Sequence, residues 1–320
     1  MSEPRRVKVD ANGVSLNVYQ LTDSVETGSQ PPVIMLHGMR DVGLSLLPIA
    51  EAIAREHPVY LMDLRGHGWS DQPGNYAMVQ HVFDLHAVLA TLAETPSILF
   101  GHSLGGQIVC RFAALYPELA HAAVVVEGLG PPARRHHQDP AEAMRMEGER
   151  ILQTLSIPET QRPLPDIQFA AERLLANNPR LPPERALELA RQGTRTNADG
   201  VLNWAFDQRV ASVFVGLGAD DSARYWPQVR CPTCIISGAL SAEYWRRAVP
   251  AGADWNGEFA AGELDARAAS FQNAEHVVLE GSGHMVHFDE PERLSEVTLQ
   301  FLQRQRQPDR VKNSQLLSAT

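Results

Sequence analysis

Cysteine is scarce in this chain, and long apolar runs are missing. Only three cysteines occur among 320 residues, Cys110, Cys231 and Cys234, too few for a disulfide scaffold. No apolar stretch approaches the roughly 20 residues that a helix needs to cross a bilayer, and the first ten residues lack the apolar core of a signal peptide. We therefore expect no membrane partner and a reducing, cytoplasmic setting.

Positive charge is also in deficit. Lysine and arginine number 28 against 38 aspartates and glutamates, which gives a net charge of −10. A chain of this charge is not attracted to nucleic acid at long range, so we expect no nucleic-acid partner. With 44% hydrophobic and 21% charged residues and no internal repeat, the composition is typical of a globular protein and excludes collagen-like and wholly disordered chains.

The first 130 residues alternate between two kinds of pattern. Short continuous apolar runs predict strands that are buried on both faces, and between them lie stretches with helical spacing. This alternation predicts a parallel sheet covered on both faces, with ligands bound beyond the carboxyl ends of the strands. The predicted strands are 6–10, 14–21, 33–38, 58–64, 97–101 and 120–128, and the predicted helices are 44–57, 78–94 and 104–117.

The pattern changes after residue 130. Four helix-like stretches follow without a buried strand between them, at 140–155, 165–177, 182–193 and 199–210. Strands are predicted again at 234–238 and 276–281, and a closing helix at 291–305. We therefore divide the chain into a core of residues 1–130 and 229–306, a helical insertion of residues 131–228, and a flexible tail of residues 307–320.

The sharpest chemical signal is the segment Gly101–Gly106, which reads GHSLGG. Its serine directly follows a predicted buried strand and precedes a predicted helix. Glycines on both sides allow a sharp strand–turn–helix elbow that exposes the serine oxygen at the sheet edge. The pattern predicts Ser103 as a nucleophile, against the alternative of an ordinary glycine-rich loop.

A serine nucleophile needs a base and an oxyanion site. His284 follows a predicted strand in a loop at the same sheet edge and is the predicted base, with His287 as a local competitor. His102 is expected to pack or to form a hydrogen bond on the other side of the elbow. The predicted oxyanion donors are the backbone N–H groups of Leu104, directly after the nucleophile, and Met39, in the His37–Arg40 loop.

These segments together resemble the α/β-hydrolase superfamily, in its cap-bearing branch. The matching pieces are LHG at 36–38, MDLRGHGWSD at 62–71, GHSLGG at 101–106, CPTCIISG at 231–238 and GSGHMVHFDEPERL at 281–294. The resemblance implies an α/β fold with an eight-stranded, mostly parallel sheet, an antiparallel first hairpin, and residues 131–228 as a helical cap inserted after strand 6. It also implies that the loop 63–70 supports the site structurally.

The triad acid departs from that resemblance. The superfamily usually carries an aspartate at the position that is Ser241 here, and a serine has no charge to stabilise an imidazolium. Glu127 ends the predicted strand that is the sixth in the superfamily's count, and the resemblance implies that the sixth and seventh strands are neighbours, about 4.8 Å apart. Glu127 is therefore the predicted acid. Glu243 is the fallback. Weaker alternatives are Asp254, Glu258 and Asp265.

Two further motifs have simpler interpretations. Cys231 and Cys234 have the C-x-x-C spacing of a metal site, but zinc sites need four ligands and no second pair exists. The segment 134–137, RRHH, is expected to be solvated. We expect neither a metal nor an organic cofactor.

The predicted function is hydrolysis of a small-molecule ester, thioester or lactone through an acyl-serine intermediate. The serine argues against relatives that use an aspartate nucleophile, the haloalkane dehalogenases and epoxide hydrolases. A C–C bond hydrolase, a cofactor-free haloperoxidase and a non-catalytic ligand-binding protein remain alternatives, and the oligomeric state is not predicted. Aromatic residues of the insertion are candidates for an apolar pocket: Phe169, Trp204, Phe206, Phe214, Tyr225 and Trp226.

Overall fold

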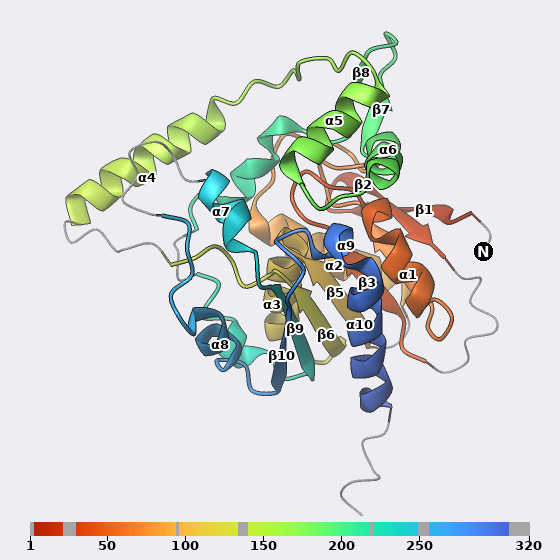
Figure 1. The fold of residues 1–320 in the computed structure, drawn as a ribbon, viewed down its shortest axis with the longest axis vertical. Helices are drawn as coiled ribbons and strands as arrows, with labels where there is room; N and C mark the ends of the chain where they lie inside the picture. The colour runs from red at the N-terminus through yellow and green to blue at the C-terminus, as the bar shows by residue number, and fades with distance from the viewer. Residues whose placement is uncertain are drawn as a thin grey trace, which may run out of the picture.

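A single eight-stranded sheet forms the centre of the molecule (Figure 1). The computed structural model describes residues 3–21, 30–93, 96–133, 140–217, 221–248 and 256–306. In sheet order the strands are β1 (Arg5–Ala11), β2 (Val14–Gln20), β4 (Val59–Met62), β3 (Val33–Leu36), β5 (Ser97–His102), β6 (Ala120–Val126), β9 (Thr233–Gly238) and β10 (Ala274–Leu279). Strand β2 is antiparallel to both neighbours and the other pairs are parallel. The predicted fold class is therefore confirmed.

Helices cover both faces of this sheet. A short 3₁₀ turn η1 (Gly43–Leu46), α1 (Leu47–Ile53), α9 (Val286–Asp289) and α10 (Pro291–Gln305) pack on one face. On the other face lie α2 (Met78–Leu92), α3 (Leu104–Leu115) and α8 (Glu263–Ala268). Strands β3, β4 and β5 are buried along their whole length, which explains why their sequences are continuously apolar rather than alternating.

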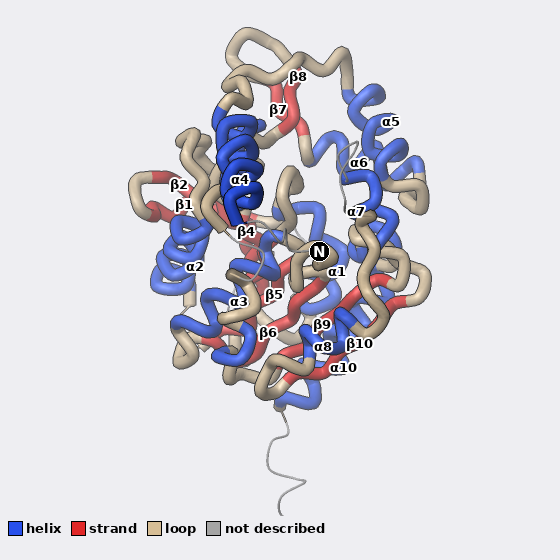
Figure 2. The backbone as a smooth tube through the Cα atoms, turned by 90° about the vertical axis from the view of Figure 1, so that its left-hand side faces the viewer, coloured by secondary structure: helices blue, strands red, loops and turns tan. Residues whose placement is uncertain are grey.

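The inserted elements lie between β6 and β9 in the chain. They are α4 (Pro140–Leu155), α5 (Ile167–Asn177), α6 (Pro183–Gln192), β7 (Thr194–Thr196), β8 (Leu202–Trp204), η2 (Gln208–Phe214) and η3 (Trp226–Gln228). Figure 1 shows α5, α6 and the β7–β8 pair together at one end of the molecule, and in Figure 2 α4 lies across from α5 and α6. A small apolar cluster that includes Leu164, Leu181 and Leu189 holds α5 and α6 together.

One of the four predicted helices in this segment is wrong. Residues 199–210 form β8 and the start of η2 instead of a helix. The Asn197 side chain accepts hydrogen bonds from the N–H groups of Asp199 and Val201, and Gly200 has a φ of +79°. This turn reverses the chain and pairs Leu202–Trp204 with β7, because side-chain-to-backbone bonds of asparagine compete with helix formation.

Three predictions concern residues outside the described part of the chain: the solvated segment 134–137, the alternative acid Asp254 and the tail 307–320. Among the described residues, no helix is long and apolar enough to cross a bilayer.

Candidate active site

The predicted nucleophile lies on a strained turn between β5 and α3. Ser103 has a φ of +51° and a ψ of −113°, a conformation that costs energy in a non-glycine residue. The turn fits only because its flanks are glycines: a Cβ on Gly101 would lie 2.4 Å from the carbonyl of Gly105, and one on Gly105 would lie 2.4 Å from the carbonyl oxygen of Leu36. The local sequence therefore dictates the elbow, which presents Ser103 Oγ at the carboxyl edge of the sheet.

The three side chains predicted to form a triad lie in hydrogen-bonding contact. His284 Nε2 is 3.0 Å from Ser103 Oγ, and His284 Nδ1 is 2.9 Å from Glu127 Oε2. The histidine and the glutamate are both buried, at 4% and 9% exposure. Since Nδ1 faces a carboxylate, it carries the proton, which leaves the Nε2 lone pair directed at the serine.

Glu127 owes its position to the pairing of β6 with β9. Its N–H donates to the Ile236 carbonyl at 2.8 Å, and its φ of +51° turns the side chain toward His284. The second carboxylate oxygen, Oε1, accepts bonds from the Gly238 N–H at 2.8 Å and the Ser241 hydroxyl at 2.5 Å. Ser241, where the family resemblance leads one to expect an aspartate, therefore supports the glutamate. This supporting role of Ser241 was not predicted from the sequence.

The Met39 N–H forms no hydrogen bond with any described residue, unlike the N–H of Arg40. Arg40, with a φ of +63°, donates its own N–H to His67 Nε2 at 3.0 Å. Burial holds the pKa of His67 well below its ordinary value, so its Nε2 is available as an acceptor. His37 keeps the same loop in place, because its Nε2 accepts from the Leu64 N–H at 3.0 Å. The Met39 N–H and the Leu104 N–H, which begins α3 and so has no partner within the helix, remain the predicted donors.

Two more histidines lie directly behind the elbow. His102 donates from Nε2 to the backbone carbonyl of His284 at 2.8 Å, which agrees with the hydrogen-bonding role expected for it. His287 donates from Nε2 to Asp41 Oδ2 at 3.1 Å and does not contact the serine through any hydrogen bond between described residues. Burial opposes ionisation of Asp41, but the hydrogen bond and charge of His287 overcome it and lower the pKa of Asp41 to about 2.

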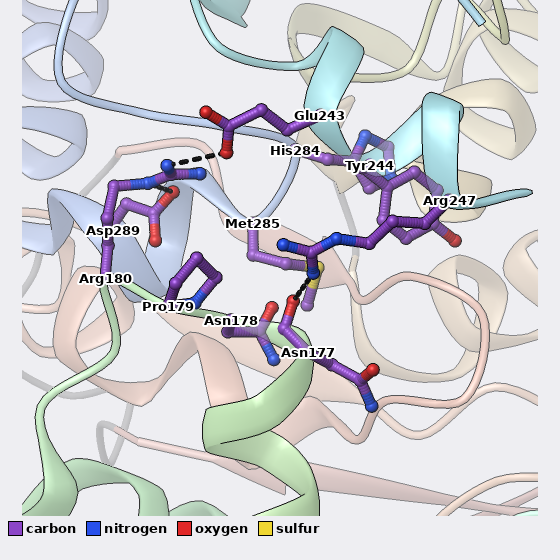
Figure 3. Close-up of a pocket in the computed structure, with 10 residues that line it drawn as sticks. All are labelled: Asn177, Asn178, Pro179, Arg180, Glu243, Tyr244, Arg247, His284, Met285 and Asp289. Carbon is purple, nitrogen blue, oxygen red and sulfur yellow. Dashed lines mark hydrogen bonds and ion pairs between the residues drawn. The ribbon is translucent and has the colours of Figure 1, made fainter.

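Aromatic side chains of α7 (Ala242–Ala248) cover the base. Tyr244 stacks on the His284 ring with centroids 4.2 Å apart, and Trp245 meets the same ring edge-on at 5.2 Å. Figure 3 shows the pocket beside this stack, with Arg180 bonded to both Glu243 and Asp289 at 2.9 Å. The fallback acid Glu243 thus has its carboxylate on an arginine rather than on His284.

The two weaker alternatives that lie in the described part of the chain are bonded to other residues. Asp265 is bonded to His276 at 2.8 Å and Glu258 to Arg246. Cys231 and Cys234 are buried free thiols. Of the described residues, one group of three could hold a metal ion, Asp41, His102 and His287, with ligand atoms within 4.8 Å of one another. That is one short of the four ligands typical of a structural zinc site.

The six aromatic residues singled out in the insertion divide by environment. Phe206 reaches the oxyanion side, where its ring lies 6.5 Å from His67 and its backbone forms a bridge with that residue. Trp204 stacks on Phe206 at 6.2 Å. For the others the contacts are different: Trp226 and Phe214 pack on the core, Tyr225 contacts Arg111, and Phe169 is 40% exposed.

This chain is similar to known proteins over most of its length. A family model described as the alpha/beta hydrolase fold matches residues 31–291. The 2-(acetamidomethylene)succinate hydrolase of Mesorhizobium japonicum is 26% identical over 73% of this chain and 77% of its own length. An esterase of Mycobacterium tuberculosis is 28% identical over 84% of this chain and 82% of its own length.

Solved structures share the fold at lower identity. A thioesterase domain from the curacin biosynthetic pathway aligns with a TM-score of 0.74 at 21% identity, over 93% of this chain and 100% of that one. The structure of E-2-(acetamidomethylene)succinate hydrolase aligns with a TM-score of 0.72 at 22% identity, over 94% and 100%. Because the family model spans most of the chain and the sheet has the same architecture, this protein belongs to the α/β-hydrolase fold family.

Proposed function

We propose that this chain is a serine hydrolase that cleaves a carboxylic ester, thioester or lactone through an acyl-serine intermediate. The observation that carries the proposal is the unbroken contact from Ser103 Oγ through His284 to Glu127, at 3.0 and 2.9 Å. The carboxylate is itself held by two further donors. A serine, a base and an orienting carboxylate in this order are what acyl transfer requires.

In the first half of the reaction, Ser103 Oγ attacks the substrate carbonyl and His284 Nε2 takes its proton. The Met39 and Leu104 N–H groups stabilise the oxyanion of the tetrahedral intermediate. Glu127 stabilises the imidazolium that forms. When the intermediate collapses, the carbon–oxygen or carbon–sulfur bond breaks and the leaving group receives the proton from His284.

In the second half, water replaces the leaving group. His284 Nε2 takes a proton from the water as its oxygen attacks the acyl carbon, and the same two N–H groups hold the second oxyanion. Collapse returns the proton to Ser103 Oγ and releases the carboxylic acid. These steps use only groups of this chain, the substrate and water.

The insertion of residues 131–228 is proposed to act as a cap over this site. Phe206, at the oxyanion side, supports an apolar pocket for the acyl or alkyl group. The names of the relatives include an esterase, a thioesterase domain and a hydrolase of 2-(acetamidomethylene)succinate. A carboxyl-derivative substrate of small size is therefore the best-supported class.

The test is covalent labelling of Ser103 by a fluorophosphonate, with hydrolysis of p-nitrophenyl esters of increasing chain length and of simple lactones. We expect one label on Ser103, and loss of at least about 10³-fold in kcat for Ser103→Ala, as for other triad nucleophiles. Ser156→Ala, at the exposed position directly after α4, is the matched control and keeps wild-type rates. A folded wild-type protein that takes no label would favour a non-catalytic binding protein and overturn the proposal.

A further inference from the structure

A second carboxylate–imidazole pair lies behind the triad, formed by Asp41 and His287. The two residues are 246 positions apart in the chain, and Asp41 Oδ2 accepts a hydrogen bond from His287 Nε2 at 3.1 Å. Their side chains are 10% and 0% exposed. The proposed mechanism uses neither residue, and burying such polar groups is costly unless they are paired.

The pair connects the loop that carries the predicted oxyanion donor with α9, the short helix that directly follows the loop of the predicted base. Asp41 lies two residues after Met39, the predicted oxyanion donor, and His287 lies three residues after His284, the predicted base. On the oxyanion side, the Asp41 carboxylate is fixed by the Ser45 hydroxyl at 2.7 Å and by the Val42 N–H at 2.8 Å. The bond between Asp41 and His287 thus links the oxyanion loop directly to α9.

His102 extends the same connection to the nucleophile. Its ring lies 4.3 Å from the His287 ring, and its Nε2 donates to the carbonyl of His284. Because His102 precedes Ser103 in the chain, the elbow, the base turn and the oxyanion loop all meet at this cluster. A displacement of about 1 Å in any of them can cost about 10²-fold in rate.

We propose that Asp41 and His287 are positioning residues that hold the oxyanion loop against the base-bearing turn, so that the Met39 N–H and His284 act on the same carbonyl. This inference rests on the proposed function. It assigns the pair no contact with substrate. The role predicts that loss of the bond weakens stabilisation of the transition state more than binding of the substrate.

A metal ion is the main competing explanation for the cluster. The Nδ1 atoms of both His102 and His287 are buried without a hydrogen-bond partner among the described residues. However, the Asp41–His287 bond already accounts for the carboxylate, and only three ligands come together. The hydrogen-bonded link therefore explains the arrangement with fewer groups, and metal content becomes an outcome of the test.

The experiment compares His287→Ala with His287→Gln, and Asp41→Ala with Asp41→Asn. The conservative variants keep a donor or an acceptor near the lost atom. Each variant is measured for kcat and KM on a p-nitrophenyl ester and for the inhibition constant of an alkyl boronic acid, whose serine adduct mimics the oxyanion. His57→Ala is the matched control, because His57 is also a buried histidine bonded to a loop carbonyl, Pro31 at 2.8 Å, but precedes β4 at the opposite sheet edge.

We expect the alanine variants to lose about 10- to 100-fold in kcat with KM changed less than about threefold, and to lose boronate affinity by a similar factor. His287→Gln and Asp41→Asn should recover most of both losses. His57→Ala should lower the thermal midpoint while keeping kcat. If an alanine variant does not fold, His287→Asn, which is too short to reach Asp41, replaces it.

Three results would overturn the inference. The first is a folded His287→Ala variant that keeps the wild-type kcat. The second is a KM and a boronate affinity that change by the same factor, with no recovery in the conservative variants. The third is one tightly bound metal ion per chain whose removal by a chelator abolishes activity. Failure of the proposed function has a different signature, because wild-type protein would then take no fluorophosphonate label at Ser103.

Discussion

Side chains at the carboxyl edge of the sheet are buried and hydrogen-bonded to several partners, whereas part of the inserted segment exposes apolar side chains to solvent. Glu127 receives three hydrogen bonds, and His284 is bonded through both ring nitrogens and covered by Tyr244. In α4, by contrast, Leu152 and Leu155 are 70% and 66% exposed.

The contrast agrees with the function proposed for each region. Catalytic groups act only within a narrow geometry, so a buried and fully bonded frame favours them. A segment that shapes a substrate pocket can accept different substrates if its surfaces repack around different acyl or alkyl groups. We infer that the edge of the core sets the chemistry and that the insertion sets the range of substrates.

The largest effect should come from the carboxylate of the triad. Glu127→Gln is expected to lower kcat by about 10²- to 10⁴-fold, because an amide neither enforces the His284 tautomer nor stabilises its cation. Glu243→Gln, whose carboxylate lies on Arg180, should change kcat by less than about tenfold. Steady-state kinetics on one ester compares the two variants, and the reverse order in folded proteins would transfer the acid role to Glu243.

A pair of leucines tests the difference in packing directly. Leu99 in β5 is fully buried, so Leu99→Ala should lower the free energy of unfolding by about 2–5 kcal/mol. Leu152→Ala in α4 should change it by no more than about 0.5 kcal/mol. Urea denaturation measures both values. A large loss at Leu152 would mean that another surface covers α4 in solution and would break the comparison.

Buried histidines should make the core sensitive to acid. Burial lowers the pKa of His81 to about 3, from an ordinary value of 6.5. Below pH 6.5 His81 therefore binds a proton more readily in the unfolded chain than in the folded one. As the pH falls from 6.5 toward 3, protonation of the unfolded chain lowers the free energy of unfolding.

At about 1.4 kcal/mol per pH unit, His81 alone accounts for up to about 2 kcal/mol between pH 7 and pH 5. Urea denaturation at both pH values should show that His81→Leu reduces the loss by that amount, whereas His121→Gln, at an exposed position, leaves it unchanged. Equal pH dependence in His81→Leu and wild-type protein would assign the acid sensitivity to other groups.

The smallest effect should fall on substrate preference. Phe206→Ala is expected to shift the ratio of kcat/KM for long and short p-nitrophenyl esters by about tenfold, in line with about 1–3 kcal/mol for a missing pocket contact. Phe169→Ala, at a residue 40% exposed, should shift it by less than about twofold. An unchanged ratio in Phe206→Ala would place the pocket wall elsewhere than at this residue.

Local patterns in the sequence were sufficient to predict most of the sheet and the turn that carries the serine. Continuous apolar runs predicted the buried strands, and the glycines around Ser103 predicted the elbow, because both depend on residues adjacent in the chain. The position of Glu127 could be predicted only because the family resemblance implies that its strand and the strand before Ser241 are neighbours, as β6 and β9 are. The helix predicted at 199–210 failed because the bonds of the Asn197 side chain favoured a turn.

The sequence by itself determined the fold class, the strained serine turn and the edge of the sheet at which reactive groups collect. Only the tertiary structure decided which distant side chains meet there: Ser241 on Glu127, Tyr244 on His284, and Asp41 on His287. The physical reason is that such contacts depend on loop paths and side-chain rotamers, which are set by packing across the whole domain rather than by the spacing of residues along the chain.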